Sequence, residues 1–241
     1  MHGAAPIERR TYGEEPSQFL DLYLPEVSRG TVVSIHGGYW RTAYSLDLHV
    51  PVAQHLRSRG WTVANIEYRR TRLDQDGIWA EMSGDVLAAI EVISDQPTPL
   101  ILLGHSAGGQ LALWAAAQPE TEVDALISLA PVSDLFLADG LELSNHATRE
   151  LFGTSAAERP DLYASASPLY LLPLGVKQLL VHGRSDEDVP FDMASEYAEA
   201  AEMAGDEVEL LDPKDVDHFD IIDPSHQIWR SIDSWLDSET S

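Results

Sequence analysis

Runs of apolar residues alternate with amphipathic stretches along most of the chain. Helical spacing predicts helices over residues 46–60, 79–94, 106–118, 192–204 and 225–236. The runs between them are rich in branched apolar side chains, and a continuous run of this kind is typical of a parallel strand buried on both faces. The predicted strands are GTVVSIHGG (30–38), WTVANIEY (61–68), PLILLG (99–104), DALISLA (124–130), KQLLVHG (177–183) and DEVELL (206–211), of which PLILLG, DALISLA and KQLLVHG are expected to be buried on both faces.

This alternation predicts an α/β protein with a mainly parallel sheet of about eight strands and helices on both faces. Two segments near the start, IERRTYG (7–13) and QFLDLYLP (18–25), predict an antiparallel hairpin on the edge of the sheet. No repeat or linker divides the chain, so residues 1–241 are interpreted as one domain. Residues 132–176 break the rhythm and are interpreted as a small partial cap, because long irregular insertions are often functional lids.

Charge and composition narrow the classes of partner. The 241 residues include 40 acidic and 15 basic ones, a net charge of −25, which disfavours binding to nucleic acid or to an anionic membrane. The absence of cysteine excludes disulfides, thiolate metal sites and cysteine nucleophiles. No run reaches the roughly 18 apolar residues of a membrane span, and MHGAAPIERR lacks the apolar core of a signal peptide. A cytoplasmic location is expected, and a homodimer is left open.

The segment LLGHSAGGQLALW places a serine in a cramped turn between a predicted strand and a predicted helix. Ser106 is flanked by Gly104 and Gly108, in the spacing G-x-S-x-G. A sharp strand-to-helix turn strains the central residue and leaves no room for side chains two positions away on either side. This is the pattern of a nucleophile elbow, which exposes the hydroxyl and puts the N–H of Ala107 at a helix N-terminus. The alternative is a structural tight turn.

A serine hydroxyl is a weak nucleophile at neutral pH and needs a neighbouring base, for which nine histidines compete. His218, in DVDHFD, follows the last predicted strand, where the chain order serine, acid, histidine puts the base. The nearest rival is His226, at the start of the last predicted helix, where an exposed or capping role fits better. The backbone direction should carry the side chain of His105 elsewhere. Surface or packing roles are expected for His2, His49, His55 and His146.

The acid that orients this base should follow a strand and precede His218. The loop VHGRSDEDVP supplies Asp186, Glu187 and Asp188 after the strand KQLLV. Asp186 is predicted as the acid, in the spacing H-G-x-x-D-x-x-V-P, and Asp188 is the alternative. Its carboxylate would hold the imidazole tautomer and stabilise the imidazolium that forms. The same acids could bind calcium, but three clustered acids without further ligands are more often a solvated loop.

The segment HGGYW (36–40), at the end of an early predicted strand, is the predicted oxyanion loop. Glycines allow the backbone to approach a developing negative charge closely, and an HGGG-type loop supplies such donors in this fold. The N–H groups of Gly38 and Tyr39 are predicted to join that of Ala107, with Gly37 shaping the turn. The alternative is a glycine turn after a strand.

With these motifs in place, the chain resembles the α/β-hydrolase superfamily over nearly its whole length. Within it, HGGYW with GHSAGG is similar to the kynurenine formamidase (arylformamidase) group, although related carboxylesterases generally carry a third glycine where Tyr39 stands. The resemblance implies hydrolysis of an ester or formyl amide without metal or cofactor. It also implies a catalytic triad of Ser106, Asp186 and His218, with residues 36–40 as the oxyanion loop.

The sequence therefore predicts a serine hydrolase that cleaves a small carboxylic ester or an aryl formamide through an acyl-enzyme intermediate. Trp40, Phe136 and Phe219 are expected to line the substrate pocket, whereas Trp114, two turns into the helix after the serine, is expected in the core. The alternatives are a non-catalytic binding protein of the same fold and a hydrolase of small peptides or amides.

Overall fold

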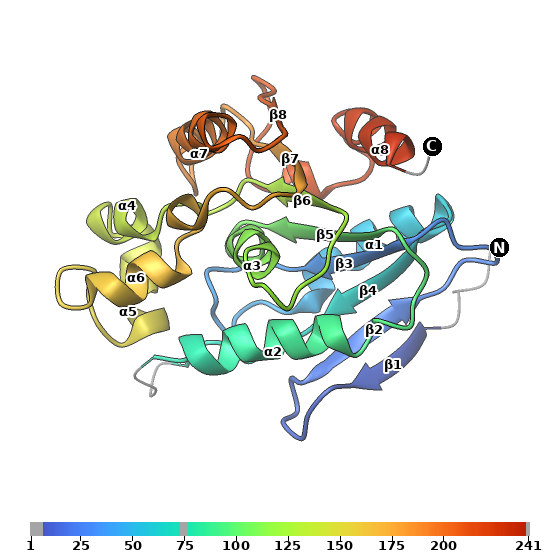
Figure 1. Ribbon diagram of the computed structural model, residues 1–241, viewed down its shortest axis with the longest axis horizontal. Helices are drawn as coiled ribbons and strands as arrows, with labels where there is room; N and C mark the ends of the chain where they lie inside the picture. Colours follow the sequence, from blue (N-terminus) through green and yellow to red (C-terminus); the bar gives the residue numbers. More distant parts are fainter. Residues whose placement is uncertain (1–6, 73–76, 240–241) are drawn as a thin grey trace.

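The computed structural model describes residues 7–72 and 77–239, and within them eight strands form one sheet (Figure 1). Across the sheet the order is β1-β2-β4-β3-β5-β6-β7-β8. β1 and β2 form the predicted edge hairpin, β2 also runs antiparallel to β4, and the other neighbours are parallel. The bounds are β1 (Ile7–Thr11), β2 (Phe19–Tyr23), β3 (Thr31–Ile35), β4 (Thr62–Ile66), β5 (Leu100–His105), β6 (Ala125–Leu129), β7 (Lys177–Val181) and β8 (Val208–Leu211).

Helices cover both faces of this sheet, as buried parallel strands require. One face packs against α2 (Trp79–Glu91), α3 (Ala107–Ala116) and α7 (Phe191–Ala204), of which α2 and α3 lie on the near side in Figure 1. The other face packs against α1 (Val50–Ser58) and α8 (Trp229–Ser238). The sheet therefore has an apolar core on each face. This is the α/β architecture that the alternating pattern predicted.

Two predicted helices differ from the observed ones. The helix expected over 46–60 is divided into a 3-10 turn, η1 (Leu46–His49), and α1, which has a proline in its first turn. The helix expected from Ser225 begins only at Trp229. Asp223 explains this delay, because its side chain accepts the N–H of Ser225 and its carbonyl accepts the N–H of His226, a local turn that competes with helix.

The region 132–176 contains α4 (Leu135–Gly140), α5 (Leu143–Phe152), α6 (Pro160–Ala166) and the 3-10 turn η2 (Pro168–Leu171). α4 contacts both α5 and α6, and the three lie together at the left of Figure 1. That region 132–176 acts as a partial cap stays a prediction. No helix within the described residues is both long enough and apolar enough to cross a membrane.

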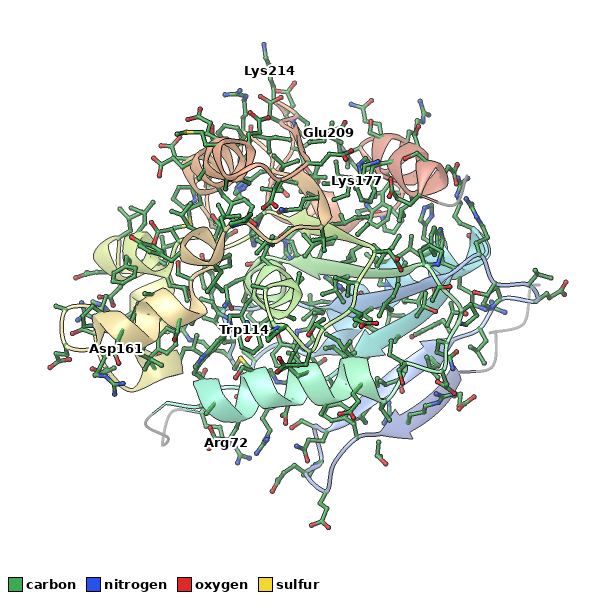
Figure 2. All side chains as sticks on the ribbon, viewed as in Figure 1. Arg72, Trp114, Asp161, Lys177, Glu209 and Lys214 are labelled. Atoms are coloured by element: carbon green, nitrogen blue, oxygen red, sulfur yellow. The ribbon has the colours of Figure 1, made fainter. Side chains whose placement is uncertain are left out.

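Trp114 belongs to α3, and its side chain lies on the side of that helix that faces α2, as Figure 2 shows. Its ring meets that of Trp79 edge-on, with centroids 5.1 Å apart, and its indole N–H donates to the carbonyl of Ser165. The prediction that Trp114 belongs to the core is confirmed. In the same view, Lys214, one of only two lysines in the chain, projects into solvent.

Candidate active site

Ser106 occupies a strained turn between β5 and α3. Its backbone angles are φ 57° and ψ −121°, a conformation that non-glycine residues rarely adopt. A Cβ on Gly104 would lie 2.1 Å from the carbonyl oxygen of Gly108, and a Cβ on Gly108 would lie 2.1 Å from that of Ile35. Each distance is far below van der Waals contact, so both positions require glycine, as the elbow pattern predicted.

The loops after β7 and β8 bring an acid and a histidine together. Nδ1 of His218 lies 2.6 Å from Oδ2 of Asp186, whose side chain is fully buried. The other oxygen, Oδ1, accepts the backbone N–H groups of Asp188 and Val189. Nε2 of His182 lies 3.3 Å from Oδ2. Asp186 is therefore the hydrogen-bond partner of His218. The role of His182, the first residue after β7, was not predicted.

These contacts control the charge on Asp186. Burial by itself would raise the pKa of its carboxyl, but the hydrogen bonds from His182 and His218, the charge of His218 and the N–H of Val189 outweigh burial and hold that pKa below 3.8. The carboxylate therefore stays ionised at neutral pH, as a group that stabilises an imidazolium must.

A small cavity of about 30 Å³ unites the two halves of the site. Ser106 and His218 both line it, and the remaining lining residues are Gly38, Tyr39, Tyr44, Leu48, His105, Asp188 and Phe219. Asp188, the alternative acid, lies at its margin and accepts the hydroxyl of Tyr39 on its backbone carbonyl. The serine, the histidine and the oxyanion loop thus face one space.

The segment after β3 has the backbone geometry of a donor loop. Gly38, Tyr39 and Trp40 all have positive φ, at 110°, 49° and 61°. Within the described residues, no hydrogen bond uses the N–H groups of Gly38, Tyr39 or Ala107. Three unpaired donors near one serine form the arrangement that stabilises a developing oxyanion. Gly37 is equally constrained, since a Cβ there would lie 2.7 Å from the carbonyl oxygen of His105.

The side chain of His36 holds the loop of residues 36–40 in place. Its Nδ1 lies 2.7 Å from the carbonyl oxygen of Gly37, and its Nε2 lies 3.1 Å from Oε1 of Glu67. The C=O and N–H of a trans peptide point in opposite directions, so holding the Gly37 carbonyl turns the N–H of Gly38 the other way. Burial would raise the pKa of Glu67, but His36 and Arg70 outweigh it and lower that pKa. The ring of His36 also stacks on Tyr68.

The side chain of His105 does not point away from the site, which corrects the prediction. The sharp elbow places the end of β5 beneath the loop that carries His218, and Nε2 of His105 donates to the backbone carbonyl of His218 at 2.9 Å. The two rings are 4.5 Å apart. Burial, together with the neighbouring His218 and His49, lowers the pKa of His105, so the ring is neutral with its proton on Nε2. Its Nδ1 is buried and has no hydrogen-bond partner among the residues that the structure describes.

His49 lies behind His105, with ring centroids 6.1 Å apart. It is fully buried, as a packing role predicts, and its Nδ1 lies 2.8 Å from the hydroxyl oxygen of Ser34. Burial lowers the pKa of His49 to about 3. A neutral pair of histidines therefore supports His218 from within the protein.

The other histidines lie outside the lining of the Ser106 cavity. His55 pairs with Asp233, and the half-buried His146 lies 3.8 Å from a carboxylate oxygen of Glu142. His226 accepts the N–H of Ile228 on its Nδ1, a capping role. His2 lies outside the described residues.

Two predicted pocket residues are placed elsewhere. Trp40 is 1% exposed, and its indole N–H donates to Oε1 of Gln110 in α3, so this ring belongs to the core. Phe136 packs on the rings of Tyr163 and Tyr170, within region 132–176. Neither lines the Ser106 cavity, because the left-handed backbone at Trp40 and the position of α4 carry them away. Phe219 does line it.

Two cavity residues, Tyr44 and Leu48, were not predicted. They follow the oxyanion loop, and their only signal is apolar character a few residues after HGGYW.

The acidic residues beside His218 were also considered as ligands for a metal cation. Asp186, Asp188 and His218 offer ligand atoms within 4.8 Å of one another. Both oxygens of Asp186 already accept hydrogen bonds, and Nδ1 of His218 is one of the donors. A cation would have to replace these bonds, so the geometry suits proton transfer better than metal binding.

Comparisons with known proteins place this geometry in a wider group. The family model BD-FAE matches residues 20–200, well over half of the chain. The isoprenylcysteine alpha-carbonyl methylesterase ICME of Arabidopsis thaliana is 25% identical over 233 residues, which cover 83% of this chain and 53% of that protein. The probable methylesterase ICMEL1 of Oryza sativa subsp. japonica is 27% identical over 230 residues, 83% of this chain and 54% of that protein. The chain thus spans about half the length of these relatives.

Solved structures agree on the architecture. A truncated carbohydrate esterase from gut microbiota has a TM-score of 0.79 at 19% identity, over 96% of this chain and 95% of that one. The butyrate-bound esterase Est2 of Thermogutta terrifontis has a TM-score of 0.77 at 22% identity, over 96% and 94%. Likeness at this level of identity shows the fold, which is the predicted α/β-hydrolase architecture.

Proposed function

We propose that this chain, which belongs to the BD-FAE family, hydrolyses carboxylic esters with Ser106 as its nucleophile. The observation that carries the proposal is the cavity that Ser106 and His218 both line. Asp186 is hydrogen-bonded to Nδ1 of the His218 imidazole. The esterase names of the relatives and of the structures with this fold support ester chemistry.

In the proposed reaction, the hydroxyl of Ser106 attacks the ester carbonyl while Nε2 of His218 accepts its proton. Asp186 holds Nδ1 of the ring and stabilises the imidazolium. The negative charge that forms on the carbonyl oxygen is stabilised by the N–H groups of Gly38, Tyr39 and Ala107. His218 then protonates the leaving alcohol, and water hydrolyses the acyl-enzyme by the reverse sequence.

Hydrolysis of an aryl formamide, the chemistry implied by the resemblance to kynurenine formamidases, is the second candidate. The observation that favours it is the size of the cavity, since a formyl group is the smallest acyl group that Ser106 could take. Its leaving group is an arylamine, which needs the same protonation by His218.

The test is turnover of p-nitrophenyl acetate and N-formylkynurenine by the purified chain and by Ser106→Ala. Ser231→Ala, an exposed serine of α8, is the matched control. We expect Ser231→Ala to keep full activity and Ser106→Ala to lose about four to six orders of magnitude in kcat. Preference for N-formylkynurenine would move the assignment to formamide hydrolysis. Equal turnover by Ser106→Ala and the unmodified chain would remove Ser106 from the mechanism, and no turnover of either substrate would favour a binding protein.

A further inference from the structure

Region 132–176 is joined to the end of the oxyanion loop by two consecutive residues. The indole N–H of Trp40 donates to Gln110, and the side-chain amide of Gln110 donates in turn to the carbonyl of Ala166 in α6. The next residue, Arg41, reaches α5 directly. The described residues that line the cavity of the candidate active site all lie outside this region. Its connection to the site therefore runs through the oxyanion loop.

The backbone of Arg41 closes the turn that carries one of the predicted oxyanion donors. Its N–H donates to the carbonyl oxygen of Gly38 at 3.0 Å, across a four-residue turn. The carbonyl of Gly38 and the N–H of Tyr39 belong to one trans peptide and point in opposite directions. The hydrogen bond from Arg41 therefore turns the N–H of Tyr39 away from the centre of the turn. His36 fixes the N–H of Gly38 in the same way, through the preceding peptide.

This turn needs support from the surrounding structure. Both of its central residues, Tyr39 and Trp40, have positive φ, a backbone that favours Gly, Asn and Asp rather than bulky side chains. Such a backbone persists only where neighbouring groups hold it. Thr71 provides part of the support, because its N–H and its hydroxyl both donate to the carbonyl of Trp40. The side chain of Arg41 provides another part.

The guanidinium of Arg41 is held by α5 through all three of its nitrogens. Nε and Nη2 lie 2.7 and 2.9 Å from the two carboxylate oxygens of Glu150, which makes a bidentate pair. Nη1 donates to the hydroxyl of Ser144 at 2.8 Å, and Nη2 donates to the carbonyl of the same residue at 2.6 Å. An isolated exposed ion pair contributes little, but a bidentate pair with further hydrogen bonds holds a defined geometry.

The part of α5 that receives Arg41 is itself unfavourable backbone. Ser144, Asn145 and His146 are left-handed, with φ of 48°, 55° and 60°. This conformation costs free energy at each L-residue, and three in succession require contacts that compensate. Arg41 supplies such contacts at the carbonyl of Ser144. The same guanidinium therefore stabilises the left-handed start of α5 and the end of the oxyanion turn.

We infer that Arg41 is a positioning residue for the oxyanion loop, and that region 132–176 acts on the site by holding this residue. The inference rests on the proposed function, because it takes the N–H of Tyr39 as a donor to the oxyanion. Without the side chain of Arg41 the turn can still close, but it is free to relax. Stabilisation of the transition state then falls, whereas binding of the substrate is retained.

Arg41→Ala tests this role with p-nitrophenyl acetate as the substrate. The variant keeps the backbone N–H and loses the contact with α5. We expect kcat to fall by about tenfold or more, with KM changed by less than about threefold. The pH profile should stay unchanged, because the acid and histidine of the triad are untouched. Arg41→Lys keeps the charge but not the planar fork, so its kcat should lie between those of Arg41→Ala and the parent.

Glu150→Ala removes the contact from the side of α5, and it is the test if Arg41→Ala does not fold. We expect the same pattern of lowered kcat and nearly constant KM. Arg149→Ala is the matched control, since this neighbouring arginine of α5 pairs with Asp139 inside region 132–176. It should lower the melting temperature by a similar amount and leave kcat within about twofold of the parent.

Two further measurements separate positioning from a general loss of stability. Phenylboronic acid forms an adduct on an active serine that places an oxygen in the oxyanion hole, so its Ki should rise in Arg41→Ala by about the factor by which kcat falls. In the double variant Arg41→Ala/Glu150→Ala the two losses should not multiply, because both changes remove one contact.

Three results would contradict these expectations. Equal kcat in Arg41→Ala and Arg149→Ala at matched melting temperatures, or losses that multiply in the double variant, would overturn the inference and leave ester hydrolysis intact. If Ser106→Ala is as active as the parent, the proposed function is wrong instead.

Discussion

On one side of the Ser106 cavity the backbone itself determines the geometry, whereas on the other side the geometry depends on side-chain hydrogen bonds. The backbone side comprises residues 35–40 and 104–108. There a Cβ on Gly37, Gly104 or Gly108 would clash with a backbone carbonyl oxygen, and Ser106, Tyr39 and Trp40 have positive φ. The side-chain side comprises the loops that carry Asp186 and His218, joined by bonds from His182 and His105. Steric requirements leave few amino acids possible at a position, but a hydrogen bond can be made by many partners.

This difference decides which changes unfold the protein and which only slow it. Gly108→Ala tests the backbone side, because its new Cβ would lie 2.1 Å from the carbonyl oxygen of Ile35. We expect the free energy of unfolding to fall by about 3 kcal/mol or more. Gly84→Ala is the matched control, since that glycine lies inside α2 with nothing within 4 Å, and should gain about 0.5–1 kcal/mol. Urea denaturation of both variants gives the comparison, and two similar values would contradict it.

Asp186→Asn tests the side-chain side. The amide cannot hold the required tautomer of His218, so we expect kcat to fall by roughly 10⁴ with the fold intact. Asp188→Asn is the matched control and should change kcat by less than about threefold, since the carboxylate of Asp188 makes no hydrogen bond to His218. The opposite ranking would show that the alternative acid is the correct one.

The same variant carries a pH signature. The folded pKa of Asp186 is lower than its unfolded value of 3.8, so the ionised carboxyl stabilises the folded chain fully above about pH 4. That contribution is lost as the pH falls below 3.8 toward the folded value. The unfolding free energy of Asp186→Asn should therefore decline less steeply with acid below pH 4. Parallel curves for the two proteins would argue against an ionised Asp186 in the folded state.

Variants of His105 test whether this residue positions His218 through its hydrogen bond or only fills space in the core. His105→Gln retains an N–H that can reach the carbonyl of His218, whereas His105→Leu retains only bulk. Loss of the hydrogen bond should displace His218 slightly, which costs up to about 100-fold in kcat with little change in KM. We expect most of kcat to return in His105→Gln. If both variants show the same kcat at matched melting temperatures, His105 serves packing alone.

His49 is tested through the pH dependence of stability. The pKa of His49 is about 3 in the folded chain and 6.5 in the unfolded chain. Between pH 3 and pH 6.5, the unfolded chain therefore binds a proton at His49 that the folded chain does not bind. The stability from neutral His49 is complete above pH 6.5 and is lost as the pH falls toward 3, by at most about 1.4 kcal/mol per pH unit. His49→Gln should flatten this slope by about one proton, measured as urea denaturation against pH. An unchanged slope would mean that His49 is protonated in the folded protein.

The same contrast explains what the sequence could predict. Branched apolar runs identified the buried strands, and G-x-S-x-G identified the elbow, because both reflect requirements that few residues meet. The choice between Asp186 and Asp188 needed the structure, since two carboxylates in one loop differ only in which one reaches His218. The start of α8 was missed because Asp223 forms a local turn that hydrophobic spacing does not report.

Side-chain direction accounts for the other errors. Trp40 and Phe136 have the chemistry of pocket residues, yet left-handed backbone and the position of α4 turn them to other contacts. His105 was expected to point away, but the elbow folds it beneath His218. Alternation patterns give the face of a strand, and they lose that information at the irregular ends of strands, where this site lies.

The most direct test of the central claim is the site and rate of covalent labelling by phenylmethylsulfonyl fluoride, followed by peptide mass spectrometry. If His218 activates Ser106, the adduct should form at Ser106 alone. Ester hydrolysis should then be lost in proportion to labelling. His218→Ala should slow labelling by at least 100-fold, whereas His226→Ala should label at the parent rate. An adduct at another residue, or equal labelling rates in the two histidine variants, would contradict the account.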